Sequence, residues 1–226
     1  MRVALALTLT FIAAVSVPKT LDSQAVLNHY ATRLLREEGP KVLVFSYTVS
    51  QLGPRDIEQT HRVYRSGDLV RDETLMVDGV RQKNIRIARY RNRYTLENLA
   101  PRVTQYAFLF ERSMRSGNAV QYSYRAVPLG ATSGFTVDAI TIDGRTYLPS
   151  LIRFHTLGAT MRGNGSVAFA KAGKYWVPSS ANVDARIGGK SARERITFTA
   201  YQFPESLPRS TFQSPRPLPT PVLPAF

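Results

Sequence analysis

The feature that most constrains the fold is a long succession of short β-rich segments between about residue 41 and residue 202. Within these segments apolar and polar residues tend to alternate, which is the period of a strand with one buried face. Turn residues separate the segments, as Ser66-Gly67 and Asp78-Gly79 do. The spacing predicts about ten strands joined as hairpins, and it leaves no room for the helices that a parallel sheet needs between strands. We therefore expect an α+β fold with a curved antiparallel sheet.

One helix precedes the strands. Apolar residues at helical spacing predict it over residues 20–38, with Tyr30 and Leu34 on its apolar stripe. A second break in the strand pattern covers residues 97–117, where the apolar spacing is irregular and partly helical. We expect this segment to be a short helix or a loop that lies over the opening of the sheet as a lid. The sheet is then predicted to wrap around the single N-terminal helix.

Two glycine-containing dipeptides mark further hairpins in the second half of the chain. Asp143-Gly144 lies between two β-rich segments and is the strongest short hairpin signal in the sequence. Asn164-Gly165 begins a formal glycosylation sequon with Ser166, but it is more simply interpreted as another hairpin turn. Both dipeptides are therefore predicted to connect strands.

The N-terminus has the pattern of a secretory signal peptide. Arg2 is followed by an apolar stretch of about fifteen residues, shorter than the about 20 that a spanning helix needs. Ala14 and Ser16 supply the small residues expected before a cleavage site near Val17. Residues 1–16 are thus predicted to be a signal peptide and the mature protein to be periplasmic. A buried N-terminal helix or an uncleaved anchor is the alternative.

The remainder divides into two parts by composition. Residues 17–203 contain the helix and the strand-rich region, and we expect them to form one domain. Residues 204–226 contain half of the 14 prolines in the chain. That density predicts an extended, polyproline-like tail in place of a packed element.

The chain is strongly basic, with a formal net charge of +14 and most of its positive charge on arginine. The arginines are scattered over the chain, with one concentration between residues 81 and 93. A solvated basic face explains most of this pattern, and attraction to an anionic membrane surface is the leading functional interpretation. Clustered lysines and interleaved aromatics, typical of nucleic-acid binding, are not evident, and we expect no nucleic-acid partner.

No motif with catalytic or metal-binding spacing is found. The chain has no cysteine, which removes thiol nucleophiles, thiolate metal sites and disulfides. His29 lies in the predicted helix, and His61 and His155 lie in predicted strands, where a lone histidine is usually structural. His61 and His155 could meet across a sheet with a carboxylate such as Glu58, but no spacing requires it. We predict no catalytic residue, no metal and no cofactor.

Three short motifs in the second half of the chain resemble those of the outer-membrane lipoprotein-sorting (LolA-like) superfamily of periplasmic carriers. They are Tyr147-Leu148-Pro149, Tyr175-Trp176-Val177-Pro178 and Phe198-Thr199-Ala200-Tyr201. The order of elements agrees with the superfamily over roughly residues 20–203. The resemblance implies an open half-barrel, capped by helices, whose apolar interior receives acyl chains. It also implies that lipid or an acylated lipoprotein is the partner.

The candidate lipid-binding residues are large apolar side chains on the helix, the lid and one strand. They are Tyr30, Leu34, Phe108, Leu109, Phe110 and Trp176. We assign Phe108, Leu109 and Phe110 to a mobile lid, and we expect Trp176 to be mainly a packing residue.

Three functional hypotheses remain open. The first is a non-enzymatic periplasmic carrier or sensor, a monomer that binds lipid or lipoprotein acyl chains in an apolar cavity. The second is a structural or interaction domain of the same fold, fully packed on its concave side, that contacts an envelope membrane protein. The third is a small-substrate enzyme or ligand binder on a cone-like α+β fold of the nuclear-transport-factor-like type. An unfilled apolar cavity would favour the first hypothesis over the second.

Overall fold

The computed structural model describes residues 22–52, 56–89, 94–117, 119–132, 134–157, 161–187 and 190–213. The predicted signal peptide, residues 1–16, and the tail beyond residue 213 lie outside these ranges. Two helices, eleven strands and one 3₁₀ turn make up the described chain. In order they are α1 (Ser23–Arg36), β1 (Val42–Leu52), β2 (Ile57–Ser66), β3 (Leu69–Val77), β4 (Val80–Arg89), α2 (Leu96–Leu99), β5 (Tyr106–Ser116), β6 (Ala119–Pro128), β7 (Phe135–Asp143), β8 (Pro149–Leu157), β9 (Met161–Ala172), β10 (Tyr175–Ile187), β11 (Lys190–Gln202) and η1 (Arg209–Phe212).

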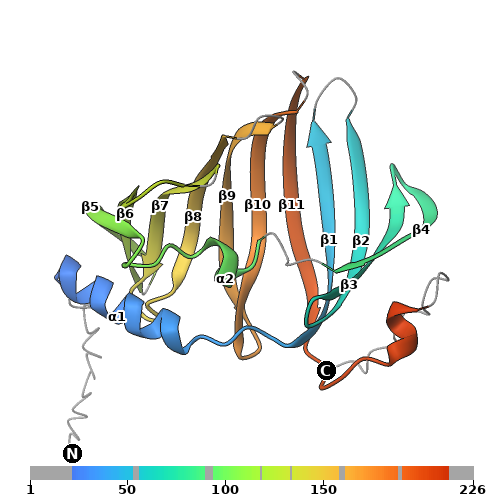
Figure 1. The fold of residues 1–226 in the computed structure, drawn as a ribbon, viewed down its shortest axis with the longest axis horizontal. Helices are drawn as coiled ribbons and strands as arrows, with labels where there is room; N and C mark the ends of the chain where they lie inside the picture. The colour runs from blue at the N-terminus through green and yellow to red at the C-terminus, as the bar shows by residue number, and fades with distance from the viewer. Residues whose placement is uncertain are drawn as a thin grey trace, which may run out of the picture.

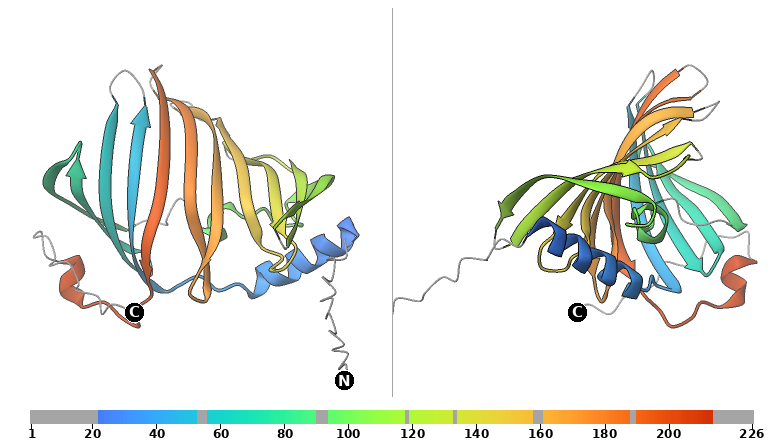
Figure 2. Two further views of the ribbon diagram at one scale, coloured as in Figure 1. Left: turned by 180° about the vertical axis from the view of Figure 1, so that it is seen from behind. Right: turned by 60° about the vertical axis from the view of Figure 1, so that its left-hand side comes forward.

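All eleven strands form one open antiparallel sheet in the order β4-β3-β2-β1-β11-β10-β9-β8-β7-β6-β5. The first strand pairs with the last at the middle of the sheet, as Tyr47 opposite Phe198 shows, so β4 and β5 become its two edges. The sheet curves strongly and leaves one concave face (Figures 1 and 2). The predicted fold class, an α+β half-barrel with a curved antiparallel sheet, is therefore confirmed.

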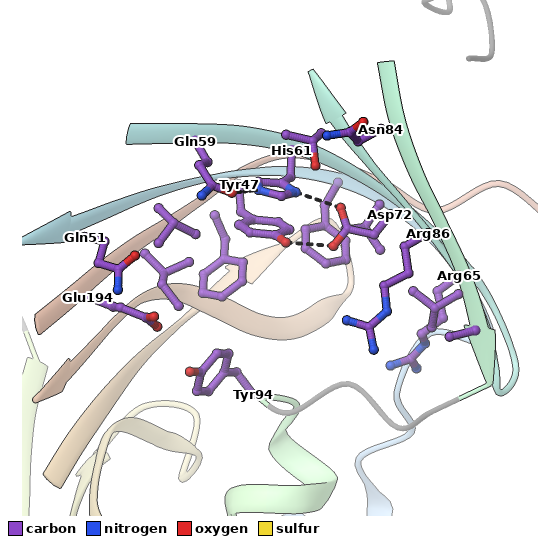
Figure 3. Close-up of a pocket in the computed structure, with 18 of the residues that line it drawn as sticks. Tyr47, Gln51, Gln59, His61, Arg65, Asp72, Asn84, Arg86, Tyr94 and Glu194 are labelled. Carbon is purple, nitrogen blue, oxygen red and sulfur yellow. Dashed lines mark hydrogen bonds and ion pairs between the residues drawn. The ribbon is translucent and has the colours of Figure 1, made fainter. Parts of the chain in front are cut away.

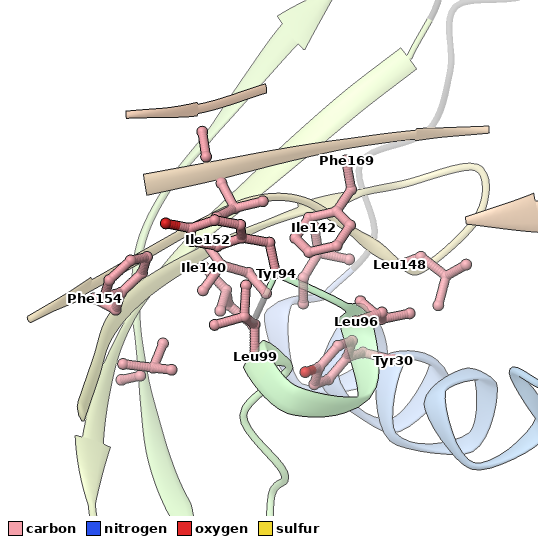
Figure 4. Packing of buried hydrophobic residues seen from close by; sticks show 14 of the residues in the cluster. Tyr30, Tyr94, Leu96, Leu99, Ile140, Ile142, Leu148, Ile152, Phe154 and Phe169 are labelled. Atoms are coloured by element: carbon pink, nitrogen blue, oxygen red, sulfur yellow. The ribbon is translucent and has the colours of Figure 1, made fainter. Parts of the chain in front are cut away.

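The connection from β4 to β5 crosses the concave face from one edge of the sheet to the other (Figure 1). Its described part, residues 94–105, contains α2 and buries Tyr94, Leu96 and Leu99 against the sheet. These side chains pack with strand residues such as Ile140 and Ile152 in the hydrophobic core (Figure 4). The crossing segment therefore forms a second layer over the sheet.

The predicted lid over residues 97–117 is wrong for most of its length. Only its beginning is helical, and residues 106–116 form the edge strand β5, paired with β6. A bulge between Phe110 and Arg112 shifts the register of this pair. The bulge breaks the two-residue period, which explains why the segment does not resemble a strand in the sequence.

The N-terminal helix covers only the β5–β8 end of the concave face (Figure 2). Its buried residues are Val26, Leu27 and Tyr30. The Tyr30 hydroxyl donates to the Pro101 carbonyl at 2.7 Å, and the Tyr124 hydroxyl donates to the Ser23 carbonyl at 2.8 Å. These bonds join the helix to the crossing segment and to β6. Burial raises the pKa of Tyr124 to about 12 from its ordinary value of 10.0, because the charged phenolate is disfavoured away from water.

The motif Phe198-Thr199-Ala200-Tyr201 contains a bulge in β11. Strict alternation would place Phe198 and Tyr201 on opposite faces of the strand. Ala200 instead adopts a left-handed conformation with φ of 53°, where the pairing with β1 shifts register. Both aromatic rings consequently contact Phe45, with centroid distances of 6.0 Å for Phe198 and 5.4 Å for Tyr201. The bulge thus brings residues three apart onto one face of a strand.

The Asp143-Gly144 signal does mark the turn between β7 and β8, but not as a two-residue hairpin. Asp143 Oδ1 accepts hydrogen bonds from the backbone N–H groups of Arg145 and Thr146, at 3.0 and 2.9 Å. Tyr147 takes the left-handed conformation, with φ of 54°. A side chain at Gly144 would lie 2.6 Å from the Val120 carbonyl oxygen, so glycine is required there by close approach.

The prediction of a turn at Asn164-Gly165 is wrong, because both residues lie inside β9. Gly165 sits directly beneath the ring of Phe154 on the neighbouring strand β8, and the two residues are paired in the sheet. A glycine inside a strand often marks such a close approach and not a turn. The aromatic ring occupies the space that a side chain at position 165 would need.

The start of the proline-rich tail is packed and not extended. Residues 209–212 form the 3₁₀ turn η1, with Thr211 buried. Arg71 on β3 is fully buried, donates to the Thr211 carbonyl at 3.0 Å and pairs with Glu73 at 2.6 Å. The buried guanidinium has its hydrogen bonds satisfied by the tail as well as by the carboxylate, which is what a buried charge requires.

Because Gly165 lies so close to the Phe154 ring, we expect that adding one methyl group at position 165 destabilises the protein. Gly165→Ala should lower the free energy of unfolding by about 1–3 kcal/mol, because the new methyl group overlaps the Phe154 ring. Gly130→Ala is the matched control, since a side chain there meets nothing within 4 Å, and it should change stability by less than about 0.5 kcal/mol. Denaturant unfolding measures both. Equal midpoints for the two variants would contradict the packing described.

Candidate functional site

A large hollow, here called the main hollow, lies on the concave face over β1–β4 and β11 (Figure 3). Its volume is about 810 Å³. Alternate residues of each strand point into it, as expected for a period of two. The apolar part of its wall is formed by Phe45, Val49, Val63, Val70, Ile196 and Phe198.

A polar network from three adjacent strands stands in the same wall. The Tyr47 hydroxyl donates to Asp72 Oδ2 at 2.8 Å, and His61 Nδ1 lies 2.9 Å from Asp72 Oδ1. His61 Nε2 lies 3.1 Å from Gln59 Oε1, and the Tyr47 and His61 rings stack with a centroid distance of 4.5 Å. The carboxylate therefore accepts from two neighbours and fixes both rings in place. Among the described residues that line the main hollow there is no serine, cysteine or lysine that this network could activate.

Three arginines stand on the β2 and β4 wall of the main hollow. Arg65 and Arg86 reach into it side by side, while Glu194 stands on the opposite side (Figure 3). Arg65 Nη2 donates to the Pro40 carbonyl at 3.1 Å, and its Nε is buried without a hydrogen-bond partner. Burial lowers the pKa of Arg65, partly offset by the Glu97 carboxylate. Arg89 pairs with Asp68 at the exposed rim, at 3.3 Å.

A second hollow of about 240 Å³, here called the apolar hollow, adjoins the first. Tyr94 and Glu194 line both hollows, so the two meet at the crossing segment. Its other walls are mostly apolar and include Leu99, Phe135, Phe154, Val183, Ala185 and Ala192. Gly163 also lines it, and a side chain there would lie 2.5 Å from the Asp184 carbonyl oxygen. Ala185 and Ala192 contribute only methyl groups to this wall.

The residues predicted to bind lipid do not gather at either hollow. Tyr30 and Phe108 pack edge to face in the helix-covered end, with ring centroids 6.1 Å apart, and Leu34 packs against the same core. Leu109 and Phe110 are 45% and 48% exposed on β5, and Leu109 faces away from the core with its pairing partner Arg125. None of these five residues lines the main or the apolar hollow.

Trp176, the sixth predicted residue, lies on β10 and lines neither hollow, but it lines a small pocket of about 40 Å³ that shares Phe45 and Arg65 with the main hollow. Its indole Nε1 donates to the Pro149 carbonyl at 2.8 Å, and its ring packs at the edge of the hydrophobic core. Pro178 on the same strand lies at a bulge, where the pairing with β9 shifts register. These are the contacts of a packing residue.

The hypothesis that His61 and His155 meet with Glu58 is wrong. Strands β2 and β8 have four other strands between them, so the two histidines are far apart. His61 instead meets Asp72 of the adjacent β3, and His155 Nδ1 lies 2.6 Å from Asp138 Oδ1 of the adjacent β7. Within the described ranges no three histidine or carboxylate side chains are grouped as metal ligands. No helix in those ranges has the length and apolar character needed to span a membrane.

The sequence matches no protein-family profile and no curated protein. Solved structures do match over most of the chain. A DUF1329 family protein from Desulfovibrio piger superposes with a TM-score of 0.53 at 10% identity, covering 84% of this chain and 96% of its own. The chain shares its fold with this protein. Two further matches carry the family in their descriptions: a LolA superfamily protein from Nitrosomonas europaea and an outer membrane lipoprotein-sorting protein domain from Vibrio parahaemolyticus.

The Nitrosomonas europaea protein has a TM-score of 0.45 and 10% identity, covering 85% of this chain and 98% of its own. The Vibrio parahaemolyticus domain has a TM-score of 0.49 and 13% identity, covering 84% and 97%. The open half-barrel that the resemblance implied is confirmed by the sheet itself and by the superposition on the DUF1329 family protein. At 10% identity this likeness extends to the fold and not to individual site residues.

The position of Trp176 predicts separate effects on stability and binding. Trp176→Ala should lower the free energy of unfolding by about 3 kcal/mol, since a large half-buried ring is lost. Trp176→Phe keeps most of the ring and loses only the hydrogen bond to Pro149, a cost of about 1 kcal/mol. Thermal unfolding checks both values. Loss of acyl-probe binding by a stably folded Trp176→Phe protein would instead place Trp176 in the binding site.

Proposed function

We propose that the protein is a non-enzymatic carrier or sensor that binds lipid, or the acyl part of a lipoprotein, on the concave face of the sheet. The observation that carries the proposal is the uneven cover of this face. Helix α1 packs at the β5–β8 end, whereas the main hollow remains over β1–β4 and β11 and the apolar hollow remains over β7–β11.

The walls of the apolar hollow suit a hydrocarbon chain. Burying one methylene group in apolar surroundings contributes about 0.8 kcal/mol, so a chain that enters the hollow gains affinity along its length. Ala185 of β10 and Ala192 of β11 are a cross-strand pair, and their small side chains leave room in the hollow. The phenol of Tyr94 stands where this hollow opens into the main one.

A packed interaction domain that contacts an envelope membrane protein is the second candidate. The dense packing at the α1 end, where Tyr30 and Tyr124 are fully buried, favours it. Such a domain gains nothing from an apolar hollow beside its core, so the two hollows favour the lipid-binding proposal.

The proposal includes export to the periplasm and action as a monomer. The export part rests on the basic Arg2 and on the short apolar stretch that follows it, which are typical of a cleaved signal peptide. Recovery from the periplasm of protein that begins near Val17 is the check, and cytoplasmic protein with Met1 intact would refute it.

Filling the apolar hollow tests the proposal. Ala185→Phe places a ring in the hollow, and we expect it to weaken binding of a fluorescent fatty-acid probe by at least about tenfold, or about 1.4 kcal/mol. Ala170→Phe is the matched control, because Ala170 is exposed on β9 and lines neither hollow, and its affinity should equal that of the wild type. Fluorescence titration gives both affinities, with circular dichroism to verify folding. No uptake of the probe by the wild type would favour the packed interaction domain.

A further inference from the structure

The polar part of the main hollow has no role in holding a hydrocarbon chain. Its wall carries the Tyr47–Asp72–His61 network and the guanidinium groups of Arg65 and Arg86. Burying polar groups beside an alkyl chain opposes binding unless those groups find partners of their own. A ligand with a polar end as well as a chain would place the polar end against this wall and the chain against the apolar walls.

Two of the positive groups in the main hollow lie side by side (Figure 3). Three arginines and two carboxylates line this hollow. Of the carboxylates, Asp72 already accepts from Tyr47 and His61, and Glu194 stands on the far side (Figure 3). Arg89 is engaged at the rim by Asp68. Arg65 and Arg86 are the guanidinium groups that reach into the interior side by side (Figure 3).

Arg65 is held in place before any ligand arrives. Its Nη2 donates to the Pro40 carbonyl, and its Nε is buried without a partner. A guanidinium fixed in this way matches the oxygens of a phosphate or carboxylate with little further ordering. Arg86 reaches the same space from β4, so an anion there would be bound from two strands of the sheet.

From these contacts we infer that the main hollow binds the anionic group of an amphiphile, a phosphate or carboxylate attached to an acyl chain. Arg65 and Arg86 hold the anionic group, and the chain runs past Tyr94 into the apolar hollow. This assignment rests on the proposed function and names the class of lipid that the site prefers.

A pair of lipids that differ only in charge tests the assignment. Lysophosphatidic acid and the monoacylglycerol with the same acyl chain are titrated against the full-length mature protein. The wild type should bind the phosphate-bearing lipid at least about tenfold more tightly, because guanidinium–phosphate pairs in a partly dry pocket are strong. The preference should shrink as salt is raised.

Arg86→Gln should bring the two affinities to within about threefold of each other, and Arg86→Lys should keep part of the difference. Arg125→Gln is the matched control, since it removes the same charge from the exposed face of β6 and should leave the preference intact. Arg65→Gln repeats the test at the second residue, with thermal unfolding to verify that it folds.

Four outcomes would overturn the assignment. Equal binding of both lipids by the wild type would leave the acyl-binding proposal standing and remove the anion site. An equal loss in Arg86→Gln and Arg125→Gln would assign the preference to overall charge. Displacement of lysophosphatidic acid by inorganic phosphate at the same concentration would make the site one for a free anion. Binding of neither lipid would refute the proposed function as well.

Discussion

The pairing of the first strand with the last determines the layout of the molecule. Because β1 joins β11 at the middle of the sheet, β4 and β5 lie at its two edges, and the chain between them must cross a whole face. The crossing segment brings Tyr94 and Leu99 onto that face and buries them there. It therefore creates the second layer that a curved sheet with a single long helix otherwise lacks.

The second layer covers one end of the concave face and leaves the other end open. The candidate site lies at the open end. At one end, Tyr30 of the helix, Pro101 of the crossing segment and Tyr124 of β6 are joined by hydrogen bonds and buried contacts. At the other end no described helix covers β1–β4, and the main hollow remains. One end of the concave face is thus densely packed, and the other end is left open.

The sequence predicted the sheet well because hairpins are local. Asp78 and Gly79 both adopt left-handed conformations between Val77 and Val80, as a two-residue hairpin turn requires, and the dipeptide alone indicates this. Errors arose where a local signal was overridden by tertiary packing. Gly165 looks like a turn residue, yet it lies inside a strand because the Phe154 ring covers it.

The candidate site was not predictable from the sequence for the same reason. His61 and Asp72 are eleven positions apart on different strands, and only the register of β2 against β3 brings them within hydrogen-bond distance. The sequence instead led to a lipid-binding prediction for large aromatic residues such as Phe108. Phe108 packs beneath a helix at the filled end, because its strand is an edge of the sheet next to α1. The position of the helix determines which end of a half-barrel remains open. Hydrophobic periodicity in the sequence does not predict that position.

The central claim is that the open half of the concave face holds a lipid. Native mass spectrometry of the protein purified gently from its own host measures this directly. The account predicts a major species heavier than the mature chain by the mass of one acylated molecule, which organic extraction releases and fragmentation identifies as a lipid or lipoprotein. A spectrum that contains only the mass of the bare chain, and an extract without lipid, would contradict it.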